Sequence, residues 1–122
     1  MSEYATLPSL QLLTAPPSAA QARFHVRADA PAAADAVERI VVASGHTDLQ
    51  MDDERQRLRF RTRRTIWNWE REVGVTITPM RRGCDVLIAL DVAPDRPSSP
   101  YDAEKNTAAV EQLQRQLEST LG

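Results

Sequence analysis

Few side chains in this sequence are of the types that perform chemistry, and none has a familiar catalytic spacing. The two histidines are His25 and His46, and Cys84 is the one cysteine. His25 alternates outward on an expected strand and His46 follows Gly45 in a loop, so we interpret both as solvated. A cysteine nucleophile needs a base nearby, and neither histidine is placed to serve Cys84. We therefore expect no catalytic residue, no metal site and no cofactor, and we favour a protein that is not an enzyme.

Arginine is concentrated in one part of the chain. The stretch "RQRLRFRTRR" spans residues 55–64, and residues 55–82 hold nine arginines and two glutamates, a net charge of +7. The rest of the chain carries −9, which gives the overall −2. A local excess of this kind is the electrostatic mark of a polyanion or acidic partner. The residues that would bind one are Arg57, Arg59, Arg61, Arg63, Arg64, Arg81 and Arg82.

The same arginines also fit the solvent face of a strand. Arg57, Arg59 and Arg61 alternate with Leu58 and Phe60, a period of two that predicts a half-buried strand. Proteins that bind single strands place aromatic rings on the exposed face, whereas the aromatic residue here falls on the apolar side. The chain also lacks the signatures of the common nucleic-acid-binding folds. We interpret these arginines mainly as the solvent-exposed face of a strand, and nucleic acid is not the expected partner.

A second group of residues suggests a ligand site. Arg71 has the parity of its apolar neighbour Trp69, which would turn a charge toward the helices. Asn106 lies on the apolar stripe of the last expected helix, where a buried amide needs hydrogen-bonding partners. We list Trp67, Trp69, Arg71 and Asn106 as candidate ligand-binding residues. The alternatives are that Arg71 turns outward or snorkels to water, that Asn106 bonds nearby backbone, and that Trp69 packs in the core.

The hydrophobic pattern predicts the elements that position these residues. Two helices have clear boundary signals. The first begins after Asp29 and ends at Gly45, and the last is capped by Ser99 with Asp102 at its third position. The expected strands cover 22–28, 48–52, 57–63, 68–79 and 85–91. The fourth is unusually long, so we expect a bend or bulge near Gly74.

Short turns between successive strands predict antiparallel pairing. A turn centred on residues 65–66 would place Arg61 opposite Glu70 and Arg59 opposite Glu72. The order β-α-β-β-β-β-α then predicts an α+β fold, a single antiparallel sheet of about five strands with two helices on one face. Residues 1–21, rich in Pro, Ala and Ser, read as a flexible or docked N-terminal arm, and residues 22–122 as a single α+β domain.

The last helix also carries a resemblance to known domains. Its first turns read Asp102-Ala-Glu-Lys-Asn106-Thr-Ala-Ala-Val110. This resembles the D-x-G-x-N-x-x-R-I opening of the last helix in small uncharacterised bacterial β-α-β4-α domains. Asp102 and Asn106 match, while Glu104 replaces the glycine and Ala109 the arginine. The resemblance implies the architecture and no catalytic activity.

Compartment and function follow from what the chain contains. A single cysteine fits a reducing compartment, the N-terminus has no secretory pattern, and no apolar run could span a membrane, so we expect a cytoplasmic protein. Our first hypothesis is non-enzymatic binding of a small ligand or a partner protein. The partner could be a second copy, forming a homodimer through the face around Gly74, Thr76, Leu87 and Ala89. The alternatives are polyanion binding through residues 55–64, and a carrier of a small apolar or anionic ligand with a cavity between sheet and helices.

Overall fold

The architecture is an α+β fold in the predicted order. The computed structural model describes residues 19–65, 69–96 and 99–122. Its elements are β1 (Ala20–Val26), α2 (Ala30–Ser44), β2 (Thr47–Met51), β3 (Arg57–Arg61), β4 (Arg71–Pro79), β5 (Cys84–Val92) and α3 (Asp102–Leu121). This order confirms the predicted β-α-β-β-β-β-α. The expected N-terminal arm falls almost wholly outside the described residues, and β1 already begins at Ala20.

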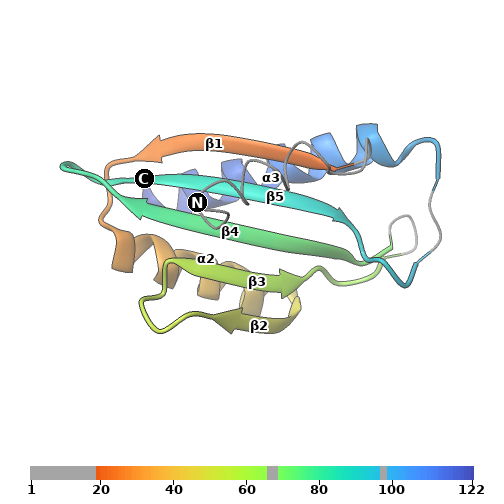
Figure 1. Ribbon diagram of the computed structural model, residues 1–122, viewed down its shortest axis with the longest axis horizontal. Helices are drawn as coiled ribbons and strands as arrows, with labels where there is room; N and C mark the ends of the chain where they lie inside the picture. The colour runs from red at the N-terminus through yellow and green to blue at the C-terminus, as the bar shows by residue number, and fades with distance from the viewer. Residues whose placement is uncertain (1–18, 66–68, 97–98) are drawn as a thin grey trace, which may run out of the picture.

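The five strands form one antiparallel sheet in the order β1-β5-β4-β3-β2. Both helices lie behind this sheet in Figure 1, α3 against β1 and β5 and α2 against β4 and β2. The two helices also contact each other. Each helix is apolar on one side only, so placing both on the same sheet face buries both stripes in one core.

Strand parity decides which side chains enter that core. Leu58, Phe60 and Val75 are each at most 3% exposed and pack with residues of both helices. Arg57 and Arg59, one position out of phase, are exposed on the opposite face. The predicted assignment of apolar and arginine faces is therefore confirmed. The face of the sheet turned away from the helices is the one viewed in Figure 1.

The predicted pairing of β3 with β4 was wrong by two residues. Arg61 lies opposite Glu72, and Arg59 lies opposite Gly74. The connection is longer than the tight turn we assumed, because the pair closes with the backbone N–H of Thr62 donating to the carbonyl of Arg71. A shift of two residues keeps every side chain on its predicted face, since the strand period is two.

The predicted irregularity in the long strand was also misplaced. β4 begins at Arg71 rather than at residue 68 and pairs without interruption through Gly74, opposite Ala89. The register shift of the sheet lies instead in β2, between Thr47 and Gln50. A shorter β4 has no need of a bulge at its centre, because nine residues is within the usual range for a strand.

The predicted boundaries of α2 are confirmed, whereas the predicted start of α3 was wrong by two residues. Asp29 caps α2 by accepting a hydrogen bond from the Ala32 N–H at 2.9 Å, and Gly45 ends it with φ 72°. At the start of α3 the Asp102 carboxylate accepts a hydrogen bond from the Ser99 N–H at 2.7 Å. This is the carboxylate contact that a capping box predicts. The helix itself begins at Asp102, with Tyr101 as its N-cap and no side-chain cap hydrogen bond.

Candidate functional site

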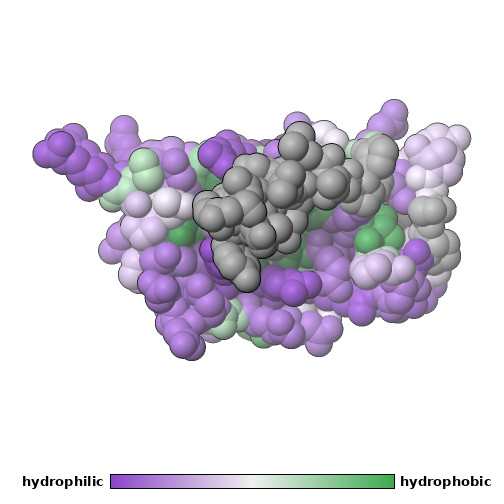
Figure 2. Space-filling view, in the orientation of Figure 1, coloured by the Kyte–Doolittle hydropathy of each residue, from purple (hydrophilic) through white to green (hydrophobic). Residues whose placement is uncertain are grey.

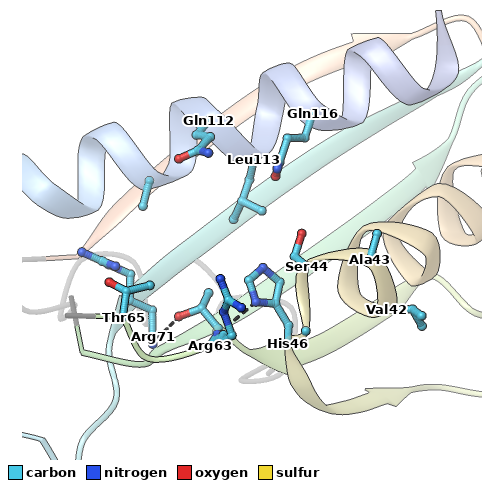
Figure 3. Close-up of a pocket in the computed structure, with 13 residues that line it drawn as sticks. Val42, Ala43, Ser44, His46, Arg63, Thr65, Arg71, Gln112, Leu113 and Gln116 are labelled. Atoms are coloured by element: carbon cyan, nitrogen blue, oxygen red, sulfur yellow. Dashed lines mark hydrogen bonds between the residues drawn. The ribbon is translucent and has the colours of Figure 1, made fainter. Parts of the chain in front are cut away.

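An open cleft lies where the end of α2, the end of β3 and the middle of α3 come together. It has a volume of about 520 Å³. Figure 3 shows Gln112, Leu113 and Gln116 of α3 on one side, across from Ser44 and His46 at the end of α2. The lining residues are Val42, Ala43, Ser44, Gly45, His46, Thr62, Arg63, Thr65, Arg71, Ala109, Gln112, Leu113 and Gln116. Most of this wall can form hydrogen bonds.

Arg71 is the buried charge of this cleft. The first residue of β4, it points to the helix side of the sheet, as strand parity indicated, and is only 7% exposed. Its Nε donates to Oδ1 of Asn106 at 2.5 Å. Burial lowers the pKa of Arg71, while the negative charges of Asp102 and Asp91 oppose that shift. Such nearby carboxylates make a buried guanidinium tolerable.

Asn106 links Arg71 to the end of the sheet. Its side chain is fully buried, and its Nδ2 donates to Oδ1 of Asp91 at 3.0 Å. Asp91 has the parity of the outer face and lies just beyond Leu90, the last residue of β5 that pairs with β1. The partners of the amide thus include two side chains far away in sequence.

The two positions that carried the family resemblance are the two buried polar residues of α3. Asp102 is 5% exposed and lies one helical turn before Asn106. Both act on Arg71, Asp102 through its charge and Asn106 through a hydrogen bond. The spacing of Asp102 and Asn106 therefore serves to hold an arginine of the sheet beneath the helix.

The sequence did not indicate the role of His46 in this site, and its predicted solvated position was wrong. Its ring is half-buried and stacked on Phe60, with ring centroids 5.4 Å apart. Nδ1 accepts a hydrogen bond from the Arg63 N–H at 3.0 Å. Burial and the charge of Arg63 lower its pKa, so the ring is neutral at pH 7 with its proton on Nε2. No local pattern could have shown this, because Phe60 lies on β3 and Arg63 follows that strand, whereas His46 follows α2.

Trp69 does not line the cleft with Arg71. The guanidinium groups of Arg64 and Arg96 lie 4.4 and 5.7 Å from the centroid of the Trp69 ring. It is half-exposed, outside the core cluster, and does not line the cleft, so the expectation of core packing was wrong. The ring precedes β4, where the strand alternation no longer applies. Trp67 lies outside the described residues.

The seven arginines of the polyanion hypothesis do not form one cluster. Arg61 forms an ion pair with Asp95, and Arg64 stacks on Trp69, both at one end of β4. Arg81 and Arg82 lie in the β4–β5 turn at the other end, which projects at the left of Figure 1. At ~3.3 Å per residue, the nine residues of β4 separate these two ends by about 26 Å. Arg57 and Arg59 lie between them on β3, and Arg63 lines the cleft.

The apolar interior offers little space for a ligand. Between helices and sheet, the void lined by Val37, Ile40, Phe60, Val75, Ile88, Leu113 and Leu117 has a volume of about 10 Å³. That is roughly the smallest space that holds one water molecule. The open cleft meets this void at Leu113.

The remaining reactive group lies away from the cleft. Cys84 is fully buried, its Sγ 3.4 Å from the carbonyl oxygen of Ala28, and burial raises the pKa of its thiol. A raised pKa keeps the thiol protonated and unreactive. Within residues 19–65, 69–96 and 99–122, no three His, Cys, Asp or Glu side chains meet as metal ligands would. No helix of the described chain combines the length and apolar character needed to cross a bilayer.

Comparison with known proteins gives matches of structure. No protein-family model and no curated protein sequence matches this chain. DynU16, a protein in the dynemicin biosynthetic locus, superposes with a TM-score of 0.60 at 19% identity, over 87% of this chain and 48% of DynU16. CV1439 from Chromobacterium violaceum superposes with a TM-score of 0.54 at 13% identity, over 84% of this chain and 96% of CV1439. The chain shares their fold. It spans about half the length of DynU16.

A third match is more distant. The Polyketide_cyc-like protein Cgl2372 from Corynebacterium glutamicum has a TM-score of 0.39 at 12% identity, over 85% of this chain and 86% of Cgl2372. The matches with TM-scores above 0.5 agree with the architecture that the resemblance of the last helix implied.

Proposed function

We propose that this protein binds a small ligand in the cleft between the end of α2, the end of β3 and α3, without transforming it. The observation that carries the proposal is the cleft itself, about 520 Å³ in volume with a buried arginine in its wall. Ligand pockets typically measure about 300–1,000 Å³ and combine apolar surface with a few fixed polar groups. Leu113 and Ala109 provide apolar surface here, and the Arg71–Asn106 contact provides a fixed polar group.

The groups that line the cleft favour binding over catalysis. A nucleophile or general base works with a second group that activates or orients it. Cys84 is not part of the lining, and one ring nitrogen of His46 is occupied by a backbone N–H. Among the described lining residues no carboxylate is present to act as an acid or base. The lining can therefore hold a molecule by hydrogen bonds and charge.

Blocking the cleft from its exposed rim tests this proposal. Gln112 is exposed and lines the cleft, so Gln112→Trp should fill part of the space without disturbing the core. Ala108→Trp is the matched control, because Ala108 is exposed on the same helix but does not line the cleft. We expect small-molecule fragments, screened by amide NMR shifts, to perturb residues 42–46 and 62–65. Gln112→Trp should abolish these shifts and Ala108→Trp should keep them. Shifts elsewhere, or shifts that Gln112→Trp leaves unchanged, would reject the cleft.

Self-association through the outer sheet face is a second candidate. Gly74 lies opposite Ala89 and Thr76 opposite Leu87, which makes a short strip of uncharged residues in the middle of the outer face. Where described residues are visible on this side, hydrophilic ones predominate (Figure 2). A homodimer seated on the strip should dissociate in Leu87→Asp, as measured by size exclusion with light scattering. A monomer at high protein concentration, unaffected by the substitution, ends this candidate.

A further inference from the structure

The cleft differs in charge from the rest of the molecule. The chain has 17 acidic and 15 basic residues. The charged residues among the described lining of the cleft are nevertheless only Arg63 and Arg71. A shallow depression on another side of α2 shows the contrast, since Asp35, Glu38 and Arg39 line it. A ligand entering the cleft therefore meets positive charge and hydrogen-bond donors first.

His46 adds a donor of fixed direction. Because Nδ1 accepts the hydrogen bond from the Arg63 backbone, the neutral ring carries its proton on Nε2. Stacking on Phe60 holds the ring plane, and in Figure 3 the ring extends into the cleft on the side of Ser44 and Gln116. No described residue accepts a hydrogen bond from Nε2 of His46. This N–H is thus available to an acceptor in the cleft.

Arg71 is held by the protein before any ligand arrives, whereas the Arg63 side chain is exposed beside the end of α2. Arg71 is fixed by Asn106, and its charge is balanced by Asp91 and Asp102, neither of which lines the cleft. Arg63 lies along the end of α2, where an added Cβ on Gly45 would be 3.4 Å from its Cδ. The end of α2 carries a partial negative charge of about half an elementary charge, and its last turn has no basic residue to offset it. Arg63 is the cation beside this helix end. A full guanidinium charge exceeds that, which leaves this wall positive.

We propose that the ligand of this cleft carries an oxyanion, a carboxylate or a phosphate, held by the Arg63 guanidinium and the His46 Nε2–H. This inference rests on the proposed ligand-binding function and names its ligand class. An oxyanion has only acceptors, so it complements a wall that presents these donors. The apolar part of the ligand lies against Leu113 and Ala109.

Three compounds with the same ring and different head groups test the inference. Benzoate and phenyl phosphate carry the two oxyanions, and benzamide is the neutral counterpart of benzoate. We expect at least one oxyanion to shift the amide signals of Gly45, His46 and Arg63 and to bind about tenfold more tightly than benzamide, the usual effect of a charge-assisted hydrogen bond. Arg63→Gln should weaken that binding about tenfold. Arg39→Gln is the control, because it removes the same charge from an exposed position outside the cleft.

The outcomes separate this inference from the proposed function. Tighter binding of benzoate alone supports a carboxylate ligand, and tighter binding of phenyl phosphate alone supports a phosphate ester. If benzamide shifts the cleft signals as strongly as both oxyanions, the cleft binds ligands but the oxyanion inference is wrong. Equal losses in Arg63→Gln and Arg39→Gln also overturn the inference, because the effect is then one of overall charge. If none of the three compounds shifts cleft signals at millimolar concentration, both proposals fail.

Discussion

Removing the Asn106 side chain should destabilise the protein far more than a polar residue on a helix normally does. Asn106→Ala deletes the acceptor of Arg71 Nε and the donor to Asp91 in a fully buried position. A hydrogen bond to a charged group contributes about 1.5–3 kcal/mol, and leaving a buried charge without its partner adds desolvation cost. We expect a loss of about 3 kcal/mol, well within the 5–15 kcal/mol of a typical domain.

A double-mutant cycle with Arg71→Met isolates the contact. Arg71→Met alone should cost about 3–5 kcal/mol, because Asp91 and Asp102 lose the charge that balances them. In the double variant the Arg71–Asn106 bond cannot be lost twice, so we expect a coupling energy of about 1.5–3 kcal/mol. Urea denaturation measures each free energy of unfolding, and 3 kcal/mol corresponds to a midpoint shift of about 1.5 M when the m-value is about 2 kcal/mol/M.

Thr107→Ala provides the control on the same helix. Thr107 is exposed, and its hydroxyl donates only to the carbonyl of Ala103 in the preceding turn. We expect its loss to change stability by less than about 0.5 kcal/mol. A coupling energy below about 0.5 kcal/mol between Asn106 and Arg71, or an Asn106→Ala effect no larger than that of Thr107→Ala, would refute the idea that this pair fixes α3 to the sheet.

Four other variants have expected outcomes. The lowered pKa of His46 means that the unfolded chain takes up the proton first, so stability falls as pH drops below about 6.5. His46→Gln should reduce that fall in denaturation measured from pH 7 to 5, and an unchanged pH profile would contradict the half-buried ring. Gly83→Ala should cost about 2 kcal/mol or more by urea denaturation, since φ is 75° and the new Cβ would lie 2.0 Å from a β1 carbonyl oxygen. Gly74→Ala, with 4.0 Å to the nearest atom, should instead stabilise by about 0.5 kcal/mol. If the arginine row binds polyanions, heparin should retain the protein at low salt and the double variant Arg57→Gln/Arg59→Gln should elute earlier; absence of retention at low salt would end that hypothesis.

Local sequence patterns determined the elements and their faces. Alternation around Leu58 and Phe60 gave the correct inward side of β3, and Asp29 and Gly45 gave the ends of α2. Both features depend only on residues close in sequence. The two-residue period of a strand decides which side chains face inward, and a capping residue bonds the free N–H groups at the start of a helix. The inward direction of Arg71 follows from the same alternation.

Contacts between distant segments were decided only by the tertiary structure. The register of β3 on β4 depends on how the chain from Thr62 to Glu70 closes, and its residue types do not specify a turn geometry. Likewise Asn106 meets Arg71 across 35 positions of sequence, and His46 meets Phe60 only because the end of α2 folds back over β3. The amino-acid sequence could therefore show that an arginine and an amide face inward. Their meeting beside an open cleft depends on where α3 and the end of α2 lie against the sheet, which no short stretch of sequence encodes.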